Sequence, residues 1–115
     1  MKIVNKKDFL MLESGTFFAK GIKWSFDSFC VKGESLEDDF FYTDLVSIKA
    51  FDSRQLADRQ EEMIEKSTSY PIMLEEMRDG CFCDEDIFLI FEKEDLIKIR
   101  DLITITVKKI GSLWQ

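Results

Sequence analysis

Carboxylates and cysteines are the side chains of this chain whose types and spacing could support chemistry. One acidic cluster precedes an aromatic run, and an acidic triplet follows a Cys-x-Cys motif. The acidic residues are Glu34, Glu37, Asp38, Asp39, Asp84, Glu85 and Asp86. Carboxylate oxygens suit hard cations such as Ca²⁺, and a carboxylate pair with different pKa values can act as acid and base. The spacing of a calcium-binding loop is absent, and adjacent strand residues point to opposite faces, so we expect no metal site.

The three cysteines form an odd-numbered set that is too small for a disulfide framework. Cys81 and Cys83 flank a single residue, and the chain has no histidine and no fourth cysteine to complete a zinc site of the usual four ligands. We expect Cys30, Cys81 and Cys83 to be free thiols that pack as small apolar residues. Without histidine there is no Ser–His or Cys–His nucleophile pair, and no glycine-rich phosphate loop occurs. We therefore expect neither catalysis nor a cofactor.

The charge of the chain is −7, from 16 Lys and Arg against 23 Asp and Glu. Residues 33–95 hold 19 of the acids and only six of the bases. Such a surface repels nucleic acid and anionic membranes, whereas it attracts a basic protein surface. We expect a basic protein partner and no direct contact with nucleic acid or membrane. The alternative is that the acidic loops only maintain solubility.

The apolar runs are too short to cross a membrane, since the longest have five residues, as at 87–91, and a span needs about 20. Charged residues interrupt the N-terminal segment, so we expect no signal peptide. Together these features predict a cytoplasmic protein.

The elements that position these groups follow from hydrophobic periodicity. Asn5 is a favourable N-cap for a short helix over residues 5–12, and Asp52 with Gln55 forms a capping box for a helix that ends near Lys66. Alternating or continuous apolar residues predict strands at 16–24, 29–32, 41–51, 72–74 and 87–91. The last of these is apolar on both faces, which favours a central strand, and the pair Asp79–Gly80 is typical of a hairpin turn.

Residues 92–110 form the last predicted element. Apolar residues at 96, 99, 103 and 110 fit one helical face, although the β-branched segment 103–107 alternates like a strand. We favour a helix because the flanking residues are helical in pattern. Ile97, Ile105, Leu113 and Trp114 then provide a second apolar side, which indicates deep burial or a dimer contact.

These elements predict an α+β fold, a single compact domain spanning residues 1–115. We expect a mostly antiparallel sheet of about four to five strands with a short N-terminal helix, a middle surface helix and a C-terminal helix.

Five short segments between residues 3 and 103 resemble small uncharacterised proteins of bacteriophages and prophages. They are residues 14–20, 38–42, 69–71, 78–82 and 91–95. The resemblance carries no catalytic residues. It implies an accessory protein that acts inside an infected bacterium, where small acidic phage proteins often inhibit host enzymes or defence complexes by occupying nucleic-acid-binding surfaces.

The combined hypothesis is a noncatalytic acidic module that covers a basic surface of a bacterial nucleic-acid-handling or defence protein, for example a CRISPR effector. The seven acids above would attract this surface, and Tyr42 would anchor it. One alternative is a homodimeric structural or virion-associated protein whose contact involves Ile97, Ile105, Leu113 and Trp114. The other is a small ligand-binding domain.

Overall fold

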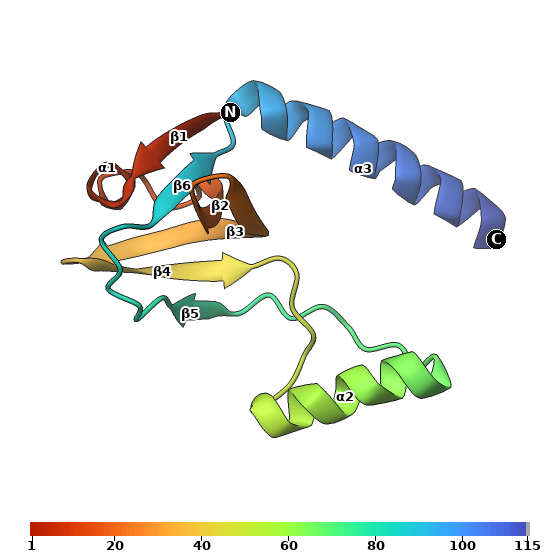
Figure 1. The fold of residues 1–115 in the computed structure, drawn as a ribbon. Coiled ribbons are helices and arrows are strands. Elements are labelled where there is room, and N and C mark those ends of the chain that lie inside the picture. Colours follow the sequence, from red (N-terminus) through yellow and green to blue (C-terminus); the bar gives the residue numbers. More distant parts are fainter. Residues whose placement is uncertain (115) are drawn as a thin grey trace.

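The structure, a computed structural model, describes the backbone of residues 1–114 and the side chains of residues 1–111. Its elements in chain order are β1 (Lys2–Asn5), α1 (Lys6–Leu10), β2 (Phe17–Ile22), β3 (Ser25–Leu36), β4 (Asp39–Asp44), α2 (Ser53–Lys66), β5 (Glu76–Arg78), β6 (Ile87–Ile90) and α3 (Lys93–Trp114). The strands form one antiparallel sheet in the order β1-β6-β2-β3-β4-β5 (Figure 1). The α+β class is confirmed, and the sheet has six strands instead of four or five.

The predicted helix caps are present. The side chain of Asn5 accepts a hydrogen bond from the N–H of Asp8 at 2.8 Å, and Asp52 accepts one from the N–H of Gln55 at 2.7 Å. The Gln55 side chain in turn accepts the N–H of Phe51 at 2.7 Å. These bonds begin α1 and α2 because they satisfy N–H groups that have no partner within the helix.

The C-terminal helix is also confirmed, and its β-branched segment is helical. The hydroxyls of Thr104 and Thr106 donate to the carbonyls of Arg100 and Leu102, at 2.8 and 2.9 Å. These local bonds give the two hydroxyls acceptors within the helix, so the β-branched segment is accommodated there without unpaired hydroxyl groups.

The strands differ from the prediction on both sides of α2. β4 ends at Asp44, so the alternating segment 46–50 is not a strand, and one bridge joins Ile48 to Ile72. This bridge is also the only pairing recorded for the predicted strand 72–74 within the described chain, and the next strand is β5. Alternation predicts a strand only where a neighbour completes the hydrogen-bond ladder, and here the chain leaves the sheet toward α2.

Asp79 and Gly80 do not close a hairpin, because the strands on their two sides pair elsewhere. β5 pairs with β4, whereas β6 lies between β1 and β2, so residues 79–86 cross from one part of the sheet to another. The prediction that 87–91 contains an inner strand is confirmed, since Phe88 and Ile90 of β6 are buried.

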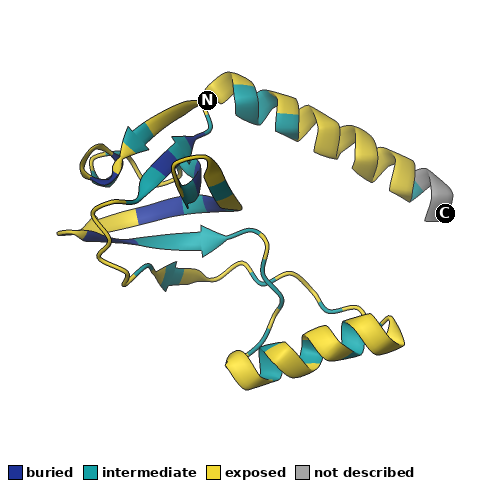
Figure 2. Cartoon of the chain, viewed as in Figure 1, coloured by how far each residue is buried: buried dark blue, intermediate teal, exposed yellow. Residues whose placement is uncertain are grey.

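The core lies on one face of the sheet, under α1. Phe9 of α1 is 0 % exposed, and its ring stacks on Phe88 with 3.9 Å between centroids. The rings of Phe18 and Phe40 approach Phe9 edge-on at 4.7 and 4.9 Å. Figure 2 shows the buried residues gathered in α1 and the central strands, while α2 and most of α3 are exposed.

Two helices extend away from this core (Figure 1). α2 contains no buried residue, and α3 contributes none among its described side chains. The radius of gyration is therefore 16.5 Å, larger than the roughly 13 Å of a tightly packed domain of this length. None of the described helices combines the length and the apolar character needed to cross a membrane.

We predict that Phe9→Ala destabilises the fold by about 3–5 kcal/mol, because it removes the ring that all the other core aromatics contact. Met11→Ala is the matched control, since Met11 is 79 % exposed and lies one residue past α1. Chemical denaturation of both variants measures the free energy of unfolding. Equal stability of the two variants would contradict this account of the core.

Candidate functional site: an acidic turn and a crossing loop

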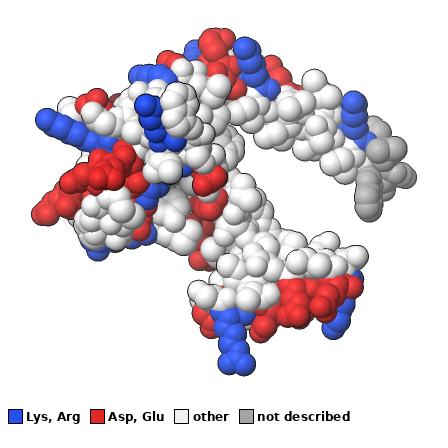
Figure 3. All heavy atoms as spheres, in the orientation of Figure 1, with Lys and Arg blue, Asp and Glu red and all other residues white. Residues whose placement is uncertain are grey.

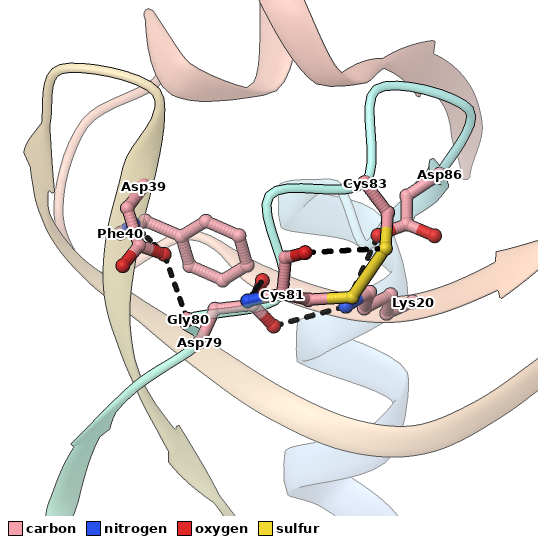
Figure 4. Close-up of polar contacts among 8 residues, drawn as sticks. All are labelled: Lys20, Asp39, Phe40, Asp79, Gly80, Cys81, Cys83 and Asp86. Atoms are coloured by element: carbon pink, nitrogen blue, oxygen red, sulfur yellow. Dashed lines mark hydrogen bonds and ion pairs between the residues drawn. A yellow bond between two sulfur atoms is a disulfide. The ribbon is translucent and has the colours of Figure 1, made fainter.

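Two segments carry the acids singled out from the sequence. We call residues 34–39 the acidic turn, where β3 passes into β4, and residues 79–86 the crossing loop, which leads from β5 to β6. The crossing loop begins beside Asp39 and ends beside Lys20 (Figure 4). Internal ion pairs and hydrogen bonds therefore fix both of its ends to the sheet.

Asp39 fixes the beginning of the loop. Its carboxylate is fully buried, and one oxygen accepts the N–H groups of Phe40 and Gly80 at 2.9 and 3.0 Å. The other oxygen accepts a hydrogen bond from the Arg78 guanidinium. Burial alone would raise the pKa of Asp39, but these donors outweigh it and hold the pKa below its usual range. The prediction that Asp39 binds a partner is wrong, because the carboxylate is not accessible.

Lys20 of β2 fixes the end of the loop. Its ammonium lies 2.9 Å from a carboxylate oxygen of Asp79 and 3.1 Å from one of Asp86. Burial opposes the charge of Lys20, but the two carboxylates more than compensate and raise its pKa above the ordinary value. The Asp86 side chain is only 13 % exposed. The expectation that Asp86 binds a partner is therefore wrong, because its carboxylate pairs with Lys20 inside the protein.

Tyr42 was expected to anchor a partner, and the structure places it on the core instead. Its ring is half-buried, lies 6.1 Å from that of Phe40 and belongs to the side chains that pack against the core cluster. The remaining acids of the two segments are exposed, and their side chains make no hydrogen bond or ion pair within the described chain. These five are Glu34, Glu37, Asp38, Asp84 and Glu85. Figure 3 shows acidic side chains, with several basic ones among them, on the sheet body, and a second row of acidic side chains along α2.

Cys81 and Cys83 are joined by a disulfide in the crossing loop, so the expectation of three free thiols is wrong for these two (Figure 4). Cys30 is free and buried, as expected. Burial, together with the nearby carboxylate of Asp44, raises the pKa of the Cys30 thiol to about 12. This thiol is therefore protonated and unreactive near neutral pH.

Among the described residues, Cys81, Cys83 and Asp86 form a group whose potential ligand atoms lie within 4.8 Å of one another. Both sulfurs are bonded to each other, and a soft metal requires thiolates. The third ligand is also engaged, since Asp86 pairs with Lys20. With the disulfide formed and Asp86 paired with Lys20, these three residues do not supply ligands for a metal ion.

The burial of two lysines was not predicted from the sequence. Lys6 is 3 % exposed, and its ammonium lies 6.0 Å from the ring centroid of Phe82 in the crossing loop. Lys32 is 2 % exposed, donates to the Gly33 carbonyl at 3.0 Å and lies 5.7 Å from the Phe9 ring centroid. Burial lowers the pKa of Lys32, against the smaller opposing effect of Glu34. Alternation along β3 was the available signal, because it places Lys32 on the same face as buried Cys30.

Of the four residues expected at a dimer contact, the structure describes the side chains of Ile97 and Ile105. Ile97 lines a groove of about 890 Å³ between α3 and the sheet. Ile105 is 53 % exposed and is not among the residues that line this groove. The side chains of Leu113 and Trp114 lie outside the described part of the chain.

Comparisons of the chain with protein-family models, with curated proteins and with solved structures found no match.

We predict that Asp39→Asn lowers the free energy of unfolding by about 2–3 kcal/mol at neutral pH, since it removes a buried charge-assisted bond to Arg78. Asp38→Asn is the control, because Asp38 is exposed and its side chain is unpaired. The pKa of Asp39 is lower in the folded than in the unfolded chain. The contribution of the ionised Asp39 to the free energy of unfolding is therefore complete above about pH 4, the pKa of the group in the unfolded chain. It disappears as the pH falls through the lower pKa of the group in the folded chain.

Denaturation at several pH values measures this dependence. The difference between the wild-type chain and Asp39→Asn should shrink in acid. A difference that is constant with pH, or equal effects of Asp38→Asn and Asp39→Asn, would refute the role given to Asp39.

Thiol counting tests the disulfide. In denaturant without reductant, alkylation followed by mass spectrometry should modify one cysteine, Cys30, and reduction should expose all three. In the native protein Cys30 should react slowly, because it is buried and its pKa is raised. Three reactive thiols in the unreduced, denatured chain would show that Cys81 and Cys83 are not bonded.

Proposed function

We propose that this chain is a noncatalytic protein-binding module whose exposed acids attract a basic surface of a bacterial protein. The observation that carries the proposal is the division of the acids into two groups. Asp39, Asp79 and Asp86 are held by internal partners and position the acidic turn and the crossing loop. The five exposed acids of the same segments have no such partner and project from this rigid base.

The electrostatics of this arrangement suit rapid association. Clustered like charges raise the rate at which an oppositely charged surface is encountered by about 10- to 1,000-fold, and salt suppresses the effect. The ion pair of Arg78 with Asp39 and those of Lys20 with Asp79 and Asp86 fix both ends of the loop before binding, so little ordering is required when a partner docks. The mode we propose is occupation of the basic surface by the acidic turn and the outer part of the crossing loop.

The partner class follows from the same chemistry. Basic surfaces that accept exposed carboxylates are typical of proteins that bind nucleic acid phosphates. Together with the resemblance to phage accessory proteins, this favours a nucleic-acid-handling or defence protein in the bacterial cytoplasm, for example a CRISPR effector, as the target of inhibition.

The shifted carboxyl groups also favour binding over catalysis. The pKa values of Asp39 and Asp95 are lowered, and each carboxylate is held in an ion pair, with Arg78 and with the amino group of Met1. Catalytic carboxylates in acid–base pairs instead face a substrate with pKa values shifted apart. We therefore assign these groups to structural support.

The charge-reversed variant Asp38→Lys/Asp84→Lys tests the proposal. Affinity capture from bacterial lysate at low salt and at about 0.3 M salt should identify a partner that the wild-type chain holds at low salt and loses at high salt. The charge-reversed chain should lose this partner and associate with it more slowly.

The matched control is Asp58→Lys/Glu61→Lys, which makes the same change in net charge on exposed positions of α2. It should retain the partner. Equal capture by all three chains would show that the acidic turn and crossing loop are not the binding surface. Equal loss of the partner by both variants would show that the net charge of the chain, and not the position of the acids, controls binding.

A further inference from the structure

The second face of the sheet is apolar and only partly covered. The rings of Phe17 and Phe29 lie 5.4 Å apart, and those of Phe29 and Phe91 lie 5.0 Å apart. With the first half of α3 they line the 890 Å³ groove. α3 contributes apolar side chains that include Leu96, Ile99 and Ile103, and the bases Lys93 and Arg100. The groove is open to solvent along α3, so its apolar walls lack a filling partner within the described chain.

The second half of α3 extends beyond this groove and carries the same apolar stripe. Ile103, the last apolar residue of α3 in the groove, is 56 % exposed, and Val107 and Ile110 beyond it are 60 and 50 % exposed. The helical repeat of 3.6 residues places them on the side of α3 that faces the groove. Figure 3 shows α2 and α3 with uncharged surfaces toward the same open side of the molecule.

The spacing of this stripe is self-complementary. Leu96, Ile99, Ile103, Val107 and Ile110 follow one another at intervals of 3, 4, 4 and 3 residues, a series that reads the same in both directions. In an antiparallel pair of α3 helices centred on Ile103, Leu96 therefore lies opposite Ile110, Ile99 opposite Val107, and Ile103 opposite its copy. A two-fold axis requires this kind of self-matching surface.

We propose that this chain forms a symmetric homodimer through α3. The two α3 helices pack antiparallel about Ile103, and the protruding half of each occupies the groove between the α3 and the sheet of the other copy. The dimer uses a surface distinct from the acidic turn and the crossing loop, so it does not depend on the partner proposed above.

The test measures the mass of the purified full-length chain by light scattering and sedimentation over a wide concentration range. The wild-type chain should have twice the 13.5 kDa mass of one copy. Ile103→Glu and Val107→Glu should be monomeric at the same concentrations with unchanged circular dichroism, because both side chains are already exposed in a single copy.

Ile105→Glu is the matched control, since Ile105 is 53 % exposed and the helical repeat places it on the side of α3 away from the stripe. It should remain dimeric. A monomeric wild-type chain would overturn the proposal, and so would a dimer that Ile105→Glu splits or that Ile103→Glu leaves intact.

Cross-linking tests the antiparallel register. Ile103→Cys should join two copies through a short thiol-reactive cross-linker, because residue 103 meets its copy at the two-fold axis, whereas Ile105→Cys should not. Equal cross-linking of the two variants would overturn the register.

Discussion

The stacking of Phe9 on Phe88 is the contact on which the rest of the structure depends. A helix of five residues is not stable alone, so α1 forms because Asn5 caps it and Phe9 is buried. The Phe9 ring covers the centre of the sheet face and brings β2, β4 and β6 onto one aromatic cluster. Lys32 reaches the same ring, so burial of Phe9 also determines where a buried charge lies.

This small core has a consequence for function. It is completed by α1 and the central strands, and α2 and the described side chains of α3 contribute no buried residue to it. The segments that carry exposed acids and the helices that carry exposed apolar residues therefore lie outside the folded centre. Internal ion pairs then fix the crossing loop, while α3 keeps an apolar side that its own chain does not cover.

Features that depend on neighbours in sequence could be predicted. Asn5 and Asp52 capped the helices as expected, because a cap is satisfied within three residues. Features that depend on distant partners could not. The alternating segment 46–50 has no strand beside it, and Asp79–Gly80 lies in a loop because β6 pairs with β1 and β2. Among the acids, composition indicated an acidic site but could not separate buried Asp39 from exposed Asp38, since Arg78 is 39 residues away.

The core of the sheet body contains no α3 side chain, and we propose that the apolar side of α3 packs against a second copy. Hydrogen–deuterium exchange of the wild-type chain and of its Ile103→Glu variant tests this arrangement most directly. We predict that amides of residues 96–111 are protected in the wild-type chain and exchange rapidly in the variant, while those of β2, β3 and β4 are protected in both. Equal protection of α3 in the two chains, or rapid exchange of α3 in the wild-type chain, would contradict the account.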